Sequence, residues 1–226
     1  MMTRLLVHVE GETEETFVNE VLRTHLVEAG YHSVGARLVG NSRARARRGG
    51  IASWDVVKRD IVRHLSGDPG CTATTMVDFY ALPTSWPGRT QAVGLASFKK
   101  TECMNSALLN DMEASTPHWQ RFEPFVLMHE FEALLFSDCA AFTAAIGHNA
   151  AAHPLQQIRD AFATPEDIND SPETAPSKRV GAVIKGYQKV LSGSVGAIGI
   201  GLDNIRQQCP SFHNWLSRLE ARITQS

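Results

Sequence analysis

Acidic residues follow three predicted strands at the points where each strand ends. Glu10 closes the first apolar run, Asp78 lies at the end of the third strand, and Glu130 follows the fourth. Because the carboxyl ends of parallel strands face a common crevice, we expect these carboxylates to lie together. Gathered carboxylates repel one another unless a cation neutralises them or some are protonated. The pattern therefore predicts a site for Mg2+, or Mn2+, of the kind used in phosphoryl transfer.

The same acids also have structural interpretations. Glu10 could cap the following helix through its backbone N–H groups, and Asp78 could form a turn before the two aromatic residues that follow it. Glu14 and Glu15 suit the positive end of the helix that begins near Thr13. We therefore interpret Glu14 and Glu15 as residues of the helix start.

The segment HEFEALLF supplies only one candidate ligand. On a regular helix, Glu130 and Glu132 are separated by about 200°, so both cannot face one ion, and we assign the site to Glu130. Position 133 is Ala, so the segment lacks the H-E-x-x-H pattern of zinc peptidases. His129 is as readily structural as catalytic.

A run of arginines between small residues could bind phosphate, because guanidinium groups grip it bidentately. The candidate nucleic-acid-binding residues are Arg43, Arg45, Arg47, Arg48, Lys178 and Arg179. A solvated surface loop explains the arginine run equally well. The 22 Lys and Arg against 24 Asp and Glu give a net charge of -2, so contact with nucleic acid has to be local.

Two other kinds of enzyme are disfavoured by missing motifs. The chain has no G-x-S-x-G, and no Cys adjoins a His, which argues against a serine or cysteine nucleophile. The phosphate-binding loop G-x-x-x-x-G-K-[ST] is also missing, so any use of ATP is expected from a partner.

Alternating strands and helices must position these residues. The pattern predicts an α/β fold with a mostly parallel, Rossmann-like sheet flanked by helices. The expected strands are 5–9, 35–39, 72–79 and 124–128, and the expected helices are 13–29, 54–65 and 107–114. After His129 the chain is mainly helical, interrupted by a polar stretch at 164–178. We therefore expect an α/β core over 1–140 and a helical elaboration over 141–226, packed together as one unit.

The four cysteines indicate the compartment. None has C-x-x-C spacing, so they are expected to be free thiols in a reducing environment. The N-terminal apolar run turns acidic too early for a signal peptide, and no stretch approaches the ~20 apolar residues of a membrane span. We expect a cytoplasmic protein without membrane contact.

Five segments in order resemble the Toprim-like members of domain-of-unknown-function family 4276. They are VEGETEE, MVDFYALP, HEFEALLF, PEDINDSPETAPSKR and CPSFHNWL, and the resemblance runs from Leu5 to about Leu219. It implies a Toprim fold, shared with topoisomerases, primases and the nuclease half of OLD-family proteins. It also implies an AAA- or ABC-type ATPase as partner, in defence against phage or other foreign DNA.

The resemblance also assigns roles. The Glu after the first strand of a Toprim domain is a general acid or base and a metal-site residue, which here is Glu10. The D-x-D motif after the third strand reads Asp78-Phe79-Tyr80, so its second Asp is missing. Glu130 is implied to supply the lacking carboxylate, and a single-metal or inactive site stays open.

Three functions follow as expectations. The first is a Mg-dependent nuclease acting on nucleic acid, DNA rather than RNA, beside its ATPase. The second is a non-catalytic adaptor that binds the ATPase and nucleic acid. The third is nucleotidyl transfer of the primase kind, for which no template-binding surface is evident.

Overall fold

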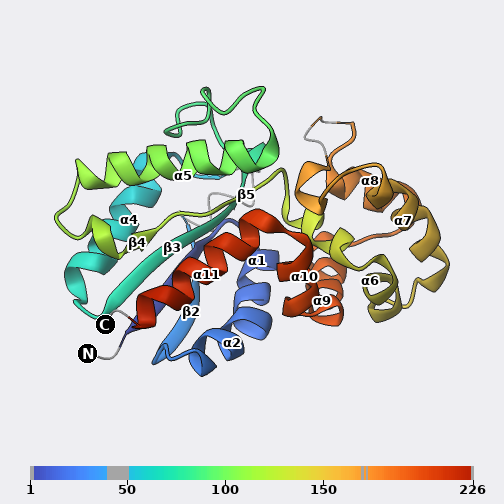
Figure 1. The fold of residues 1–226 in the computed structure, drawn as a ribbon, viewed down its shortest axis with the longest axis horizontal. Helices are drawn as coiled ribbons and strands as arrows, with labels where there is room; N and C mark the ends of the chain where they lie inside the picture. Colours follow the sequence, from blue (N-terminus) through green and yellow to red (C-terminus); the bar gives the residue numbers. More distant parts are fainter. Residues whose placement is uncertain (1–2, 40–50, 169–170, 172, 225–226) are drawn as a thin grey trace.

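A parallel β-sheet forms the centre of the computed structural model, which describes residues 3–39, 51–168, 171 and 173–224. The strands are β1 (Arg4–Val9), β2 (Ser33–Leu38), β3 (Cys71–Asp78), β4 (Phe122–Glu123) and β5 (Val126–Leu127). Their order is β2-β1-β3-β4, and β5 pairs with the end of β3 beyond β4 (Figure 1). Every pairing is parallel. The predicted α/β fold with a parallel sheet is confirmed.

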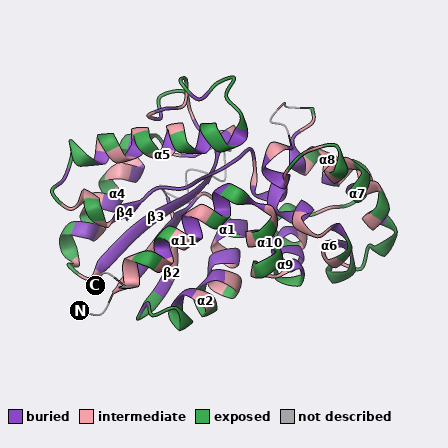
Figure 2. Ribbon diagram, viewed as in Figure 1, coloured by how far each residue is buried: buried purple, intermediate pink, exposed green. Residues whose placement is uncertain are grey.

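The fourth expected strand is divided in two. Pro124 lies between β4 and β5, and a proline has no N–H with which to continue the ladder. β3, in contrast, is buried along its whole length, as Figure 2 shows. A strand covered on both faces reads as a nearly continuous run of apolar and small residues, and this explains the sequence of β3.

One face of the sheet carries α4 (Trp54–Gly67) and α5 (Ser97–Glu113). α5 begins well before the predicted helix at 107. Its buried side chains include Thr101, Met104, Leu108 and Met112, at spacings of three and four residues. The first turns have few apolar residues, so the sequence pattern detected only the second half of the helix.

The other face carries the helical rod that follows β1. It consists of α1 (Glu12–Phe17), a π-helical segment η1 (Val18–Leu22) and α2 (Arg23–Glu28). The N-cap of the rod is Gly11, so the helix begins at Glu12, one residue before the start expected at Thr13. The last helix, α11 (Pro210–Thr224), returns to this same face (Figure 1).

A helical lobe lies beyond the carboxyl ends of the strands (Figure 1). It contains η4 (Phe131–Ser137), α6 (Cys139–Ala145), η5 (Asn149–Ala151), α7 (Ala152–Asp160), η6 (Pro165–Asp167), α8 (Pro176–Val183), α9 (Lys189–Ile200) and α10 (Leu202–Gln208). The helical C-terminal region is therefore confirmed. No helix in the described part of the chain is long and apolar enough to cross a membrane.

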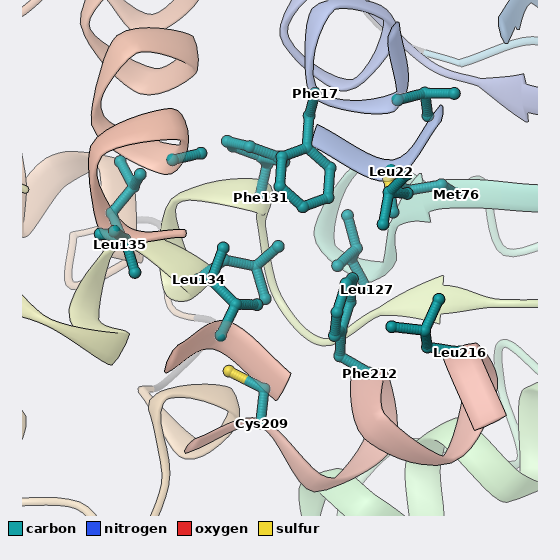
Figure 3. Close-up of a cluster of buried hydrophobic side chains, with 14 of the residues drawn as sticks. Phe17, Leu22, Met76, Leu127, Phe131, Leu134, Leu135, Cys209, Phe212 and Leu216 are labelled. Atoms are coloured by element: carbon teal, nitrogen blue, oxygen red, sulfur yellow. The ribbon is translucent and has the colours of Figure 1, made fainter. Parts of the chain in front are cut away.

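The lobe and the sheet share one hydrophobic cluster. Phe17 of α1 meets Phe131 of η4 edge to face, with ring centroids 5.4 Å apart (Figure 3). Leu134, Cys209 and Phe212 continue the cluster from η4 to the start of α11. This shared core holds the lobe against the edge of the sheet where Glu10 and Asp78 lie.

Candidate functional site

The carboxyl ends of β1 and β3 bring the first two predicted site residues together. Val9 pairs with Met76 in the parallel ladder, so the chain leaves both strands at the same edge. There the Glu10 carboxylate accepts a hydrogen bond of 3.3 Å from the backbone N–H of Asp78. Glu10 is half-buried, whereas Asp78 is buried.

The turn after β5 folds over Asp78. His129 adopts a positive φ of 67°, and its carbonyl accepts a 3.0 Å hydrogen bond from the N–H of Tyr80. Two residues later, the N–H of Phe131 donates a 2.9 Å hydrogen bond to Oδ1 of Asp78. These contacts fix the orientation of the Asp78 carboxylate.

The ammonium of Lys189, the first residue of α9, lies between two buried carboxylates. Its Nζ is 2.9 Å from Oε2 of Glu132 and 3.5 Å from Oδ2 of Asp78. The hydroxyl of Tyr187 donates to Oε1 of Glu132 at 3.4 Å. Glu132 is completely buried, but the Lys189 side chain retains 43% of its exposure. Lys189 therefore reaches from solvent into an acidic cluster.

Burial and mutual repulsion set the protonation of this cluster. Burial raises the pKa of Asp78 well above its usual value, Lys189 opposes that rise, and the charge of Glu14 adds to it. Burial also raises the pKa of Glu132, again against Lys189. For Lys189 burial acts to lower the pKa, but Asp78 and Glu132 outweigh it and the pKa is raised. Lys189 thus stays protonated, and its charge opposes the protonation of Asp78 and Glu132 that burial favours.

Glu14 serves both the helix start and the cluster. Its carboxylate accepts a 3.0 Å hydrogen bond from the N–H of Gly11, which is one half of a capping box, since Gly11 has no side chain to return the bond. The side chain is nevertheless buried, and burial raises its pKa. Its negative charge contributes to raising the pKa of both Asp78 and Lys189. The sequence indicated only its role at the helix start.

Glu130 has a different environment from the one expected. The backbone of Glu130 is extended and precedes the 3-10 helix η4, so the premise of a regular helix through this residue was wrong. Its Oε2 accepts a 2.9 Å hydrogen bond from the N–H of Ser177, in the first turn of α8. Glu132, which the helical spacing set aside, is the residue that shares Lys189 with Asp78.

Neither Lys189 nor Tyr187 was singled out as a site residue from the sequence. Neither belongs to a motif, and both are remote along the chain from the strand ends. A lysine preceded by glycine and aromatic residues at a helix start carries no pattern that distinguishes a buried ion pair from a surface charge. Only the packing of α9 against the sheet edge reveals their role.

The basic candidates are distributed differently. Arg43, Arg45, Arg47 and Arg48 lie outside the described residues. Lys178 is exposed on α8. The Arg179 guanidinium donates a 2.8 Å hydrogen bond to the Thr174 carbonyl and lies 5.3 Å from the centroid of the Phe162 ring. These contacts give Arg179 a structural role within the lobe.

The carboxylates at this site suit a magnesium ion only if the ion takes one or two protein ligands. Among the described residues, no three His, Cys, Asp or Glu side chains are grouped so that they could hold a metal ion, and the expected trio of Glu10, Asp78 and Glu130 is no exception. Magnesium, however, commonly takes one or two carboxylates and completes its shell with water and substrate phosphate. Glu10 and Asp78, as adjacent hard oxygen donors, fit that requirement.

The fold and site define an α/β protein whose parallel sheet presents a carboxylate cluster, paired with a lysine, at its carboxyl edge against a helical lobe. The model of the family described as Domain of unknown function (DUF4276) matches residues 9–220, and the chain belongs to this family. No curated protein and no solved structure matches the chain.

Proposed function

We propose that this protein is a divalent-metal-dependent phosphodiesterase that cleaves nucleic acid, DNA rather than RNA. It acts as the Toprim-like subunit of a defence system whose ATPase is a separate AAA- or ABC-type protein. The main support is the contact between Glu10 and Asp78 across the ends of β1 and β3. Its free cysteines favour a reducing, cytoplasmic location.

Glu10 and Asp78 would hold the Mg2+ or Mn2+ ion. When bound, such an ion would supply Lewis-acid stabilisation of the phosphate and would make the attacking water easier to deprotonate. The chain lacks an acid at Tyr80, where a D-x-D motif has its second Asp. This departure supports one metal rather than two.

The residues around the pair have separate tasks. Glu10 is half-buried, so its carboxylate is accessible to receive a proton from the attacking water. The hydrogen bond from the N–H of Phe131 keeps the Asp78 carboxylate in one orientation. The exposed Lys178 and the arginines at 43–48 contact the phosphate backbone, which gives affinity without sequence preference.

The test is a plasmid-cleavage assay with Mg2+ or Mn2+, with and without the neighbouring ATPase. Glu10→Gln and Asp78→Asn should each lower cleavage by about a hundred-fold or more, because each removes a charged ligand or proton acceptor. Glu12→Gln is the matched control, since Glu12 is an exposed acid in the same turn. Melting temperatures establish that the variants are folded. Unchanged metal-dependent cleavage in both site variants contradicts the proposal.

A second function is favoured by one observation. The Lys189 ammonium already forms ion pairs with both Asp78 and Glu132. A non-catalytic adaptor that binds its ATPase and nucleic acid requires no metal ion at this site. Calorimetry with Mg2+ and Mn2+ separates the two functions, because an adaptor should show no binding that depends on Glu10 and Asp78.

A further inference from the structure

The position of the Lys189 ammonium conflicts with an ion bound to Asp78. Nζ of Lys189 lies 3.5 Å from Oδ2 of Asp78, while Oδ1 is engaged by the N–H of Phe131. A magnesium ion on the same carboxylate would stand about 2.0–2.1 Å from an oxygen. Two cations so close repel each other strongly where little water separates them. The ammonium and the ion therefore exclude each other from Asp78.

The side chain of Lys189 has room to move away from Asp78. It retains 43% of its exposure, and its flexible four-carbon stem starts from the first residue of α9. Before it lies Gln188 in an extended conformation, outside the helix. Withdrawal of the ammonium thus requires rotation of one side chain and no displacement of the helix.

We propose that Lys189 is an internal competitor of the divalent ion. The ammonium pairs with Oδ2 of Asp78 while the site is empty of metal, and it leaves Asp78 when the ion binds. This inference rests on the proposed function, because it takes Asp78 as a ligand of the ion. It adds that the affinity for metal is lowered by the cost of breaking the Lys189–Asp78 ion pair.

The first experiment measures the reactivity of Lys189 in the unmodified protein. Amine acylation followed by peptide mass spectrometry is run without metal and at a Mn2+ concentration that saturates binding by calorimetry. The acylation rate of Lys189 should rise several-fold with Mn2+. Lys58 is the matched control, since its Nζ is 2.9 Å from Asp111, its side chain is 22% exposed and no part of its ion pair involves the site. An unchanged rate at Lys189 under saturation overturns the inference.

The second experiment measures Mn2+ affinity directly by electron paramagnetic resonance. Lys189→Met keeps most of the unbranched side chain and removes its charge, so Mn2+ should bind about ten-fold more tightly or better. Asp78→Asn in the same background should abolish that gain. Equal Mn2+ affinity of the wild type and Lys189→Met overturns the inference and leaves the proposed function intact. Tighter Mn2+ binding by Lys189→Met, together with no plasmid cleavage by the wild type, supports the inference and contradicts the nuclease. If neither the wild type nor Lys189→Met binds Mn2+, the inference and the proposed function are both contradicted.

Discussion

The indole N–H of Trp215 donates a 2.9 Å hydrogen bond to the hydroxyl of Thr74. Trp215 belongs to the last helix and Thr74 to the central strand β3, and both are fully buried. Trp215 also stacks on Phe125, with centroids 4.6 Å apart and planes 10° from parallel. The C-terminal helix is therefore part of the core that supports the sheet, and residues near 74 depend on it.

Breaking this contact should destabilise the whole fold. Trp215→Phe and Thr74→Val each remove a partner of a buried hydrogen bond, which costs about 1–3 kcal/mol of unfolding free energy. Urea denaturation of the two single variants and the double variant measures the coupling. Because the side chains are in direct contact, the double variant should lose less than the sum of the single losses. Strictly additive losses contradict a direct interaction.

The second prediction concerns His8, which is fully buried on β1. Its Nδ1 lies 3.2 Å from the Thr74 carbonyl oxygen, and its Nε2 lies 3.2 Å from Nδ1 of His64 on α4. Burial, then the charge of His64 and that of Arg37 on β2, lower the pKa of His8 to about 3, against the opposing effect of the Thr74 carbonyl. His8 is thus neutral in the folded protein.

The stability contributed by neutral His8 is lost on acidification. The unfolded chain binds a proton at His8 below a pH of about 6.5, whereas the folded chain does so only near 3. The free energy of unfolding should therefore be highest above 6.5 and fall as the pH drops toward 3. Between pH 6.5 and 4.5 this group alone contributes a loss of roughly 2–3 kcal/mol.

Comparison with His8→Gln isolates that contribution, because acidic residues also titrate in this range. Urea unfolding of both proteins at pH 7 and pH 4.5 gives the two losses. The unfolding free energy of the wild type should fall by roughly 2–3 kcal/mol more than that of His8→Gln. Equal losses would show that His8 takes up its proton in the folded state.

The third prediction concerns the close packing of α9 on α6. A Cβ at Gly196 would stand 2.4 Å from Cδ2 of Phe142, well inside van der Waals contact. Gly196→Ala should therefore lower the unfolding free energy by about 1–3 kcal/mol. Gly181→Ala in α8 is the matched control, because a Cβ there meets nothing within 4 Å.

The control should behave in the opposite way. Alanine at position 181 restricts the unfolded chain at no steric cost, so stability should rise by about 0.4–1 kcal/mol. Thermal denaturation of the two variants measures both changes. Unchanged stability of Gly196→Ala would show that α9 can move away from α6. Lys189, the first residue of α9, would then move with it.

Local pattern accounts for the part of the fold that could be predicted. The strands near 4–9, 33–38 and 71–78 were recognisable because a buried strand is short, apolar and bounded by turn residues. Alternation with helices then implies a parallel sheet. From that, the meeting of Glu10 and Asp78 at one edge follows without any knowledge of side-chain contacts.

The errors lie where local pattern is ambiguous. The segment after 128 is apolar enough for a helix, but His129 has a positive φ, Glu130 is extended, and a 3-10 helix begins only at Phe131, so the angle between Glu130 and Glu132 was misjudged. The start of α5 was missed because its early turns have few apolar residues.

By itself, the order of residues determined the alternating elements and the two acids at the strand ends, since both depend on neighbours along the chain. Tertiary structure alone decided that Lys189 and Glu132 join Asp78, and that Glu130 turns instead to Ser177. Those partners come from segments distant in sequence, and what brings them together is the burial of the lobe against the sheet, a property of the whole packed chain.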